Sequence, residues 1–564
     1  MGLIQLNQIA KSIETGVGKN IDVTDVKDGN TIQDARLTRG LAAWMIVRSC
    51  GTSDVDAAQG VVDGFGDNGI DALWIDHDAH TIHLVQTKWS KKGTGSPALG
   101  DVHKFVQGVR DLVNAEWGKF NEKFLNHKAE LEVALEDPDL KLVLMLAYTG
   151  TDPLSQDAKS IIDNLLADMN DPIESVSFVN YSQVEIHELL KQSAAGRRPT
   201  IEATMYDWGS ITEPYTAFYG QVEASEIAGW YQQHGTRLFD SNIRQFLGAD
   251  TEVNDAIRET LEDKPEHFWY LNNGVTVLCD SIGKKTLGAN TKKTGHFEFR
   301  DISVVNGAQT VGTIGEVSKI SPEKVADARV TVRFISLEGC PEGFAVEVTR
   351  GTNTQNRVER RDFVSLDPEQ ERLANALILD GITYAIKSGS EVPAPESGFT
   401  VLDATVALAC ADKNSDYSVQ AKREVGRLWA GAEDPKPGTQ YRHLFNADLT
   451  ARKLWRSVRC LRAIDSSIAE CRNKFEGKSR LIGIHGNRLI THMCYQELPA
   501  DVFSRSDEEF LEAEASLPSL VEDVYTALIE VIAEDFPEKY LASLFKNASR
   551  CTIISKAVSA KLII

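Results

Sequence analysis

Two short apolar runs near the amino terminus decide the fold of this region. The first is Gly69-Ile70-Asp71-Ala72-Leu73-Trp74-Ile75-Asp76, and the second is Ile82-His83-Leu84-Val85-Gln86-Thr87-Lys88. Both runs are rich in β-branched and apolar residues, which favours strands. The residues between them, His77-Asp78-Ala79-His80-Thr81, are polar and suit a hairpin loop. We therefore predict a β-hairpin over residues 69–88.

Three side chains of this hairpin predict a metal-binding site. Residues two apart in a strand point to the same side of the sheet, so Gln86 and Lys88 project together. Pairing of the two strands can bring Asp71 beside them. Carboxylate and amide oxygens are hard ligands of the kind that Mg²⁺ prefers, and an ammonium group can hold a phosphate. The alternative is a hairpin with solvated polar side chains, because Asp and Lys are usually exposed.

The pattern of an aspartate, a hairpin and Gln-x-Lys resembles the PD-(D/E)xK nuclease superfamily in its Mrr-type restriction branch. The glycine-rich approach Asp63-Gly64-Phe65-Gly66-Asp67-Asn68-Gly69 also fits that branch. The resemblance implies that Asp71, Gln86 and the backbone carbonyl of Thr87 hold Mg²⁺, for which Mn²⁺ can substitute. It also implies that Lys88 orients the attacking water and stabilises charge on phosphorus. A metal at such a site polarises the phosphoryl oxygen and lowers the pKa of a bound water.

The chain departs from the superfamily at one ligand. Gln86 stands where most members carry an acid, so the predicted site has one negative charge fewer. Further carboxylates would compensate, and Asp63, Asp67 and Asp34 are the candidates. Asp34 lies at the start of a helix that we predict over residues 34–48.

Length and composition indicate a globular protein of several domains. The chain has 564 residues, which suggests two to four domains. Its eight cysteines form no C-x-x-C pair, which argues against a zinc ribbon and a disulfide framework. The start of the chain lacks the layout of a signal peptide, and the apolar run 142–148 is too short to span a bilayer. We expect a cytoplasmic protein without a membrane segment.

The charge balance is unfavourable for a nucleic-acid enzyme as a whole. The formal net charge is −22, whereas affinity for DNA comes largely from Lys and Arg on phosphates. Basic residues nevertheless cluster directly after the hairpin, where Lys91 and Lys92 follow Lys88. Trp89 in the same cluster could stack on a base. A solvated basic face is the alternative for each such cluster.

The order of the predicted elements indicates a mixed α/β fold in three parts. Strands alternate with helices over residues 1–195, which predicts a mixed sheet with flanking helices. The resemblance to the PD-(D/E)xK superfamily implies that this sheet is restriction-endonuclease-like. Residues 192–199 are small or polar and include Gly196 and Pro199, which is typical of a linker. Residues 200–480 are α+β again, and residues 481–564 are helical. We predict these ranges as three domains.

The middle region carries several motifs in a fixed order. They are Arg237-Leu238-Phe239-Asp240-Ser241-Asn242-Ile243-Arg244, Phe268-Trp269-Tyr270-Leu271-Asn272-Asn273-Gly274-Val275-Thr276, Val304-Val305-Asn306-Gly307-Ala308-Gln309-Thr310, Thr352-Asn353-Thr354-Gln355-Asn356 and Asp362-Phe363-Val364-Ser365-Leu366-Asp367. This series resembles the abortive infection phage resistance (AIPR) family. In that family a nuclease-like region with an aspartate and Gln-x-Lys often precedes the module, so the two resemblances support each other.

Polar side chains of these motifs are candidates for nucleic-acid contact. Neutral amides can bond phosphate oxygens or base edges, and an arginine can fork onto a phosphate. The candidates are Asn273, Asn306, Gln309, Asn353, Asn356, Arg244 and Arg357. The alternative is that Asn and Gly at these turns serve backbone geometry.

Together these patterns predict an Mg²⁺-dependent endonuclease that hydrolyses phosphodiester bonds in anti-phage defence. The AIPR module would give recognition or regulation. The expected partners are double-stranded DNA, a second copy in a homodimer, and a phage-derived trigger or a neighbouring defence protein. The alternative is a catalytically inactive nucleic-acid-binding sensor or regulator of a defence system.

Overall fold

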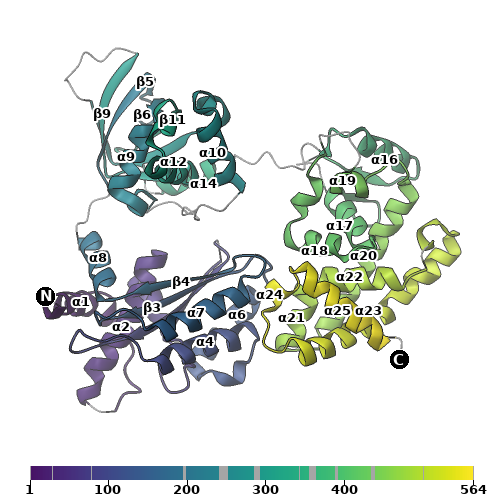
Figure 1. Cartoon of the computed structure of the whole chain (residues 1–564), viewed down its shortest axis with the longest axis horizontal. Coiled ribbons are helices and arrows are strands. Elements are labelled where there is room, and N and C mark those ends of the chain that lie inside the picture. Colours follow the sequence, from purple (N-terminus) through teal and green to yellow (C-terminus); the bar gives the residue numbers. More distant parts are fainter. Residues whose placement is uncertain are drawn as a thin grey trace. The chain divides into compact units, whose positions relative to one another are not determined.

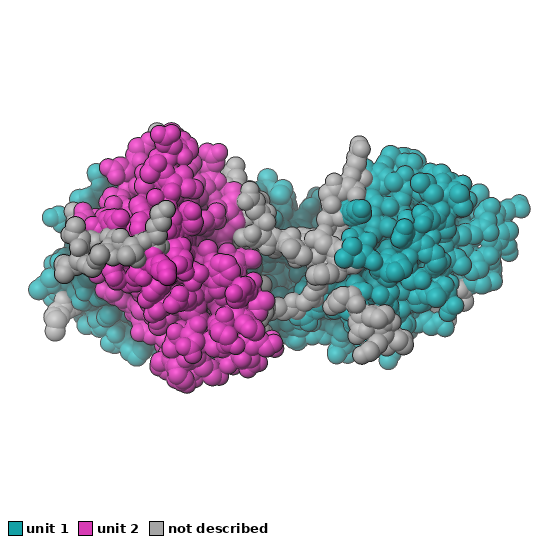
Figure 2. Space-filling view, turned by 90° about the horizontal axis from the view of Figure 1, so that it is seen from above, with its two compact units in different colours: residues 1–193, 359–564 teal, residues 194–358 magenta. Residues whose placement is uncertain are grey.

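The computed structural model forms two compact units. Unit 1 combines Met1–Ser193 with Glu359–Ile564, and unit 2 is Ala194–Val358 (Figure 2). The structure describes residues 2–27, 29–77, 79–194, 199–239, 252–284, 293–341, 343–354, 364–387, 392–432, 438–499 and 501–562. Within these ranges, no helix has the length and apolar character required to cross a membrane.

The amino-terminal part of unit 1 contains a four-stranded mixed sheet (Figure 1). Its strands are β1 (Ala72–Asp76), β2 (Thr81–Lys88), β3 (Lys141–Tyr148) and β4 (Val176–Tyr181), in that order across the sheet. β1 and β2 are antiparallel, while β2, β3 and β4 run parallel. The predicted hairpin and the predicted mixed sheet are therefore confirmed.

Helices cover both faces of this sheet because its strands are apolar on both sides. Val85 lies in one apolar cluster with Leu41 and Met45 of α2. Leu84, its neighbour in β2, lies in another with Phe105 and Val109 of α4. The helices of this part are α1 (Gly2–Thr15), α2 (Gly29–Cys50), α3 (Asp54–Gln59), α4 (Leu99–Val113), α5 (Glu122–Leu125), α6 (Lys128–Leu135), α7 (Gln156–Met169) and α8 (Gln183–Ala194). The alternation thus assigns Gln86 and Lys88 to the α4 face.

The carboxyl-terminal part of unit 1 is mainly helical, which confirms the prediction for residues 481–564, and it packs against the mixed-sheet part. Arg480 forms an ion pair with Glu136 at 2.8 Å, and Arg550 forms one with Asp171 at 2.8 Å. The helices are α16 (Pro368–Leu379), α17 (Val401–Ala411), α18 (Ser415–Glu424), α19 (Gln440–Leu444), α20 (Ala451–Arg472), α21 (Gly477–His485), α22 (Asn487–Glu497), α23 (Asp507–Asp535), α24 (Leu541–Leu544) and α25 (Ala548–Leu562). Two short strands, β12 (Thr383–Ala385) and β13 (Gly398–Thr400), pair in parallel.

Unit 2 is an α+β body around a seven-stranded sheet. The strand order is β10-β7-β11-β6-β5-β9-β8. The strands are β5 (Ile201–Ile211), β6 (Ala217–Glu223), β7 (Val275–Cys279), β8 (Ser281–Lys284), β9 (Thr294–Arg300), β10 (Ser303–Asn306) and β11 (Arg329–Ser336). The helices are α9 (Ala224–His234), α10 (Glu252–Asp263), α11 (Phe268–Leu271), α12 (Ala308–Ile320), α13 (Pro322–Ala326) and α14 (Phe344–Thr354). The predicted three-domain boundaries stay a prediction beside this two-unit division.

Candidate metal centre

Asp71 lies directly before the paired residues of the hairpin, and its backbone bonds to the second strand. Ala72 pairs with Val85, and the Asp71 amide donates to the Val85 carbonyl at 2.8 Å, just before β1 begins. The carboxylate of Asp71 contacts Thr87, which lies between Gln86 and Lys88 on β2. Gln86 and Lys88 share the α4 face of the sheet, because they are two residues apart. The structure thus brings Asp71 to residues 86–88 of β2, while a common face for all three side chains and their catalytic roles stay predictions.

Asp71 is a buried carboxylate, only 5% exposed. Its Oδ2 accepts hydrogen bonds from the amide of Thr87 at 2.6 Å and from the Thr87 hydroxyl at 2.9 Å. Burial, followed by the nearby charge of Asp63, raises the pKa of Asp71 to about 7. Within the described ranges, no Lys or Arg forms an ion pair with it. A cation beside Asp71 would offset the cost of burying its charge.

Two further carboxylates lie beside Asp71. Oxygen atoms of Asp63, Asp67 and Asp71 all lie within 4.8 Å of one another. We call these three residues the acidic cluster. Asp67, a candidate from the sequence, is thus brought to Asp71. Asp34 is not a member, and its carboxylate instead forms an ion pair with Lys91 at 2.6 Å.

The loop that carries the acidic cluster is held against α4 at two glycines. Gly69 has a φ of +79°, and a Cβ on it would lie 2.6 Å from the backbone carbonyl carbon of Lys104. A Cβ on Gly108 would lie 2.1 Å from the backbone oxygen of Asn68. The Asn68 side chain also donates to Asp111 of α4 at 2.7 Å. The close approach fixes the loop, and glycine is required at both positions.

Two cationic side chains bind the acidic cluster, and they differ in burial and in the number of their contacts. Arg39, only 3% exposed, donates from Nε to Asp63 at 2.9 Å. Its two Nη atoms fork onto Asp25 at 2.6 and 2.8 Å, and these hydrogen bonds hold the pKa of Asp25 well below its usual range. The Lys104 ammonium contacts one oxygen of Asp67 at 2.6 Å, from a side chain that is 52% exposed. Arg39 is therefore held firmly in a buried position, whereas the Lys104 ammonium is open to solvent and its partner Asp67 is buried.

Gln86 presents a buried acceptor without a donor. The side chain is 1% exposed, and its Nε2 donates to the backbone carbonyl of Asp101 at 3.1 Å. Because a carbonyl can only accept a hydrogen bond, the atom that faces Asp101 must be Nε2 of Gln86, and the other atom of the amide is Oε1. Oε1 is buried and has no hydrogen-bond partner among the described residues. An unsatisfied buried acceptor costs about 1–3 kcal/mol, so a bound cation or water is expected there.

Lys88 is held by the first turn of α4. Its Nζ lies 3.0 Å from Oδ1 of Asp101, and the side chain is 41% exposed. Burial lowers the pKa of Lys88, but the hydrogen bond to Asp101 and the charges of Asp71 and Asp67 outweigh it and raise the pKa above its ordinary value. Lys88 is therefore a charged group at neutral pH, close to the acidic cluster.

These residues fit a hard divalent cation. Three carboxylates and a free amide oxygen are the oxygen donors that Mg²⁺ and Mn²⁺ take, and Mg²⁺ keeps several waters besides. Histidine and cysteine are missing from the acidic cluster, so the donor set does not suit a structural zinc site. Asp101, Lys104 and Arg39 were not among the predicted residues. The only sequence signal for Asp101 is its place at the start of a helix.

The remaining predicted contacts are dispersed. Lys92 is exposed, whereas Trp89 is partly buried and packs against the apolar cluster of α2. In unit 2, Asn273 is exposed, Gln309 is half-buried, and the amide of Asn306 donates to the carbonyl of Thr352. The side chain of Asn353 and all of Arg244, Asn356 and Arg357 lie outside the described residues.

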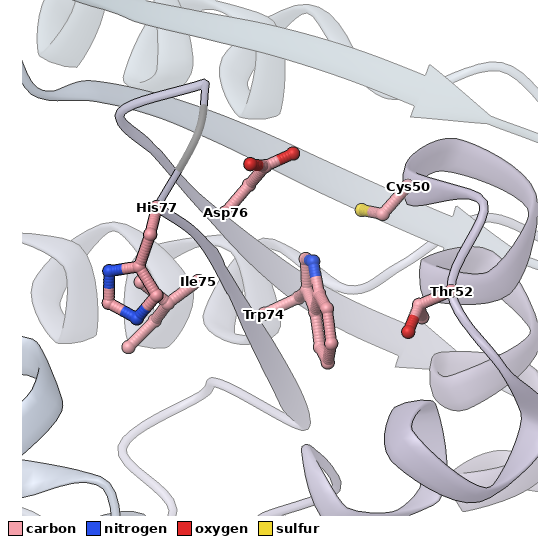
Figure 3. A pocket seen from close by; sticks show the side chains of 6 residues that line it. All are labelled: Cys50, Thr52, Trp74, Ile75, Asp76 and His77. Atoms are coloured by element: carbon pink, nitrogen blue, oxygen red, sulfur yellow. The ribbon is translucent and has the colours of Figure 1, made fainter. Parts of the chain in front are cut away.

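A separate pocket lies at the far end of β1. A cavity of about 340 Å³ is lined by Cys50, Thr52, Trp74, Ile75, Asp76 and His77. Figure 3 shows Cys50 and Thr52 on the side of α2, facing β1. Burial raises the pKa of the Cys50 thiol to about 12, so it is no thiolate nucleophile. Asp71 and Asp76 flank opposite ends of β1, so this pocket is not the candidate metal centre.

Comparison with known proteins assigns the larger part of the chain. The family model described as "AIPR protein" matches residues 239–560, which is more than half of the sequence. The chain belongs to the AIPR family. This family is linked to abortive-infection phage resistance. The match begins beyond the acidic cluster, so it does not include the candidate metal centre. No curated protein and no solved structure matches the chain.

Proposed function

We propose that this AIPR protein is a divalent-metal-dependent nuclease of the PD-(D/E)xK type. The observation that carries the proposal is the buried Oε1 of Gln86, which has no hydrogen-bond partner among the described residues. Gln86 directly precedes Thr87, whose amide and hydroxyl bind Asp71 of the acidic cluster. A polar atom buried without a partner needs a ligand, and the carboxylates of the acidic cluster favour a cation.

In this proposal, each residue of the site has a separate role in phosphodiester hydrolysis. Asp71, Asp67 and Asp63 with Gln86 would hold Mg²⁺, and the carbonyl of Thr87 is a further proposed ligand. When bound, the metal polarises the phosphoryl oxygen and lowers the pKa of a water. Lys88 keeps its positive charge beside this place, so it can orient the water and stabilise charge that develops on the phosphate. Asp101 holds both Lys88 and Gln86 in position.

The family link to phage resistance makes foreign nucleic acid the proposed target. We propose double-stranded DNA as the substrate and a homodimer as the active form, with unit 2 giving recognition or restraint. A phage-derived trigger or a neighbouring defence protein would release the activity. Lys91 and Lys92 are the proposed contacts to the phosphate backbone.

The second candidate is a nucleic-acid-binding sensor without turnover. It is favoured by Gln86 itself, because an amide in place of a carboxylate weakens the hold on a cation. The two candidates differ in one outcome: a sensor binds nucleic acid and never cuts it.

The test is incubation of the purified full chain with plasmid DNA and with RNA, in Mg²⁺, in Mn²⁺ and in EDTA. We expect cleavage that requires the metal. Asp71→Asn should abolish it, and Lys88→Met should slow it by about 10²–10³-fold. Asp76→Asn is the matched control, since Asp76 lies at the other end of the same strand and should keep full activity. A wild-type chain that binds nucleic acid but never nicks it would favour the sensor.

A further inference from the structure

We propose that Lys104 is a metal-displaced phosphate clamp. In the metal-free site its ammonium neutralises Asp67, and a divalent ion takes over that carboxylate and releases the ammonium to the phosphate of a bound nucleic acid. This inference rests on the proposed nuclease function and deepens it, since it adds a substrate-binding residue that the metal switches on.

Lys104 differs from the other cation of the acidic cluster in how firmly it is held. The Arg39 side chain is 4% exposed and bonds to both Asp63 and Asp25, so its buried guanidinium is held by two carboxylates. Among the described residues, the Lys104 ammonium bonds only to Oδ1 of Asp67, at 2.6 Å; the lysine side chain is 52% exposed, whereas that of Asp67 is 9% exposed. Because water reaches the ammonium, we expect this ion pair to change metal affinity by only about two- to fivefold. A divalent ion shared by several oxygens can therefore displace it.

The position of Lys104 on α4 shows where the released ammonium would go. Lys104 follows Asp101 by three residues, so the two lie on the same face of the helix. Asp101 holds Lys88 at 3.0 Å, and Lys104 holds Asp67. Two ammonium groups thus border the site from the α4 side. A phosphate on a metal at Asp67 and Gln86 would lie within reach of the lysine that the metal has freed.

The first measurement is the affinity for Mn²⁺, read from the electron paramagnetic resonance signal of free Mn²⁺. Removing a competing cation should help the metal, so we expect Lys104→Met to bind Mn²⁺ about two- to fivefold more tightly than wild type. Lys191→Met is the matched control, because Lys191 contacts Glu188 at 2.6 Å from a side chain that is 54% exposed, on α8. Its Mn²⁺ affinity should equal that of wild type. Equal affinities in all three proteins would overturn the inference.

The second measurement is the salt dependence of binding to a short fluorescein-labelled DNA duplex, in a Lys88→Met background that keeps the duplex intact. With Mn²⁺, Lys104→Met should reduce the slope of log K against log salt by about 0.9, the value for one phosphate contact. In EDTA it should change nothing, and Lys104→Arg should keep the full slope. The same loss with and without Mn²⁺ would contradict displacement by the metal.

The two proposals fail in distinguishable ways. A wild-type chain that binds no Mn²⁺ and cuts neither DNA nor RNA removes the nuclease function, and the role of Lys104 with it. A wild-type chain that binds Mn²⁺ and cleaves, while Lys104→Met matches it in Mn²⁺ affinity and in salt slope, removes the role of Lys104 alone.

Discussion

At the scale of single residues, the candidate centre combines atoms that a metal-free protein has little reason to bury. Asp71 is a buried carboxylate that accepts hydrogen bonds only from the neutral amide and hydroxyl of Thr87 among the described residues. The Oε1 atom of Gln86 is also buried, and no donor in the described part of the chain bonds to it. Buried polar groups without partners reduce stability, and they are typical of functional sites, where a ligand completes the missing contacts.

Asp71→Asn should therefore raise stability while it removes function. Asparagine keeps an oxygen for the two Thr87 donors and carries no charge, so we expect the metal-free variant to be about 1–3 kcal/mol more stable than wild type at pH 8. Thermal melting in EDTA measures this. Added Mn²⁺ should raise the Tm of wild type and leave that of the variant unchanged. A variant that is less stable in EDTA would argue that Asp71 serves the fold.

Gln86→Glu should strengthen metal binding. The substitution places an acid where most members of the PD-(D/E)xK superfamily have one, which gives the site a fourth carboxylate. The added negative charge attracts the cation. We expect Mn²⁺ affinity to rise about tenfold, which corresponds to about 1.4 kcal/mol. Calorimetric titration with Mn²⁺ measures it. Gln86→Leu, which is similar in size and lacks the oxygen, should lower the affinity instead. Identical affinities for the three proteins would place the metal elsewhere.

At the scale of elements, α4 positions the site. Its first turn holds Lys88 and Gln86 through Asp101, and its middle meets the loop of the acidic cluster at Gly69 and Gly108. The helix thus links the second strand of the hairpin, β2, to the loop that precedes β1. Displacing the loop from α4 would separate the ligands.

Gly108→Ala tests this link. Its Cβ would lie 2.1 Å from the backbone oxygen of Asn68, so we expect a loss of about 1–3 kcal/mol and weaker Mn²⁺ binding. Gly100→Ala on the same helix is the control, since no atom lies within 4 Å of its Cβ. It should be stabilised by about 0.4–1 kcal/mol and bind Mn²⁺ normally. Chemical denaturation and metal titration of both variants separate the two effects.

The parts of the site that the sequence predicts are those set by strand geometry. The hairpin and the common face of Gln86 and Lys88 follow from a two-residue period, and Asp67 is close to Asp71 along the chain. Asp101, Lys104 and Arg39 escape prediction because packing of separate helices brings them to the site. Asp34 forms an ion pair with Lys91, and its role as a metal ligand stays a prediction.

At the scale of the whole molecule, unit 1 joins segments from the two ends of the sequence. The carbonyl of Leu135, at the end of α6, contacts Nε2 of His485 at 2.9 Å. Lys546 donates to the carbonyl of Pro138 at 2.7 Å. Local sequence patterns do not report contacts between residues so distant in sequence, so these contacts could not be predicted from the sequence. The helical part therefore stabilises the part that carries the candidate metal centre.

His485 should make this junction sensitive to acid. Burial, and then the charge of Lys422, lowers the pKa of His485 to about 3, so the folded protein holds a neutral imidazole. The unfolded chain binds the proton from its ordinary pKa of about 6.5 downward. Stability is thus full above about pH 6.5 and falls by about 1.4 kcal/mol per pH unit as the pH drops toward 3.

His485→Gln removes this titration while keeping a donor for Leu135. Between pH 6.5 and pH 5, the unfolding free energy of wild type should fall faster than that of the variant by about 1.4 kcal/mol per pH unit. Urea denaturation over this range measures the difference. Parallel pH profiles would show that the imidazole is not buried as described.

The most direct test of the central claim is to locate Mn²⁺ in crystals of the full chain by anomalous diffraction. We predict one strong peak bounded by Asp71, Asp67 and Oε1 of Gln86, with metal–oxygen distances of about 2.1 Å. Crystals that hold Mn²⁺ elsewhere, or that leave Gln86 Oε1 bonded to a water with no metal beside Asp71, would contradict a metal-dependent nuclease at this hairpin.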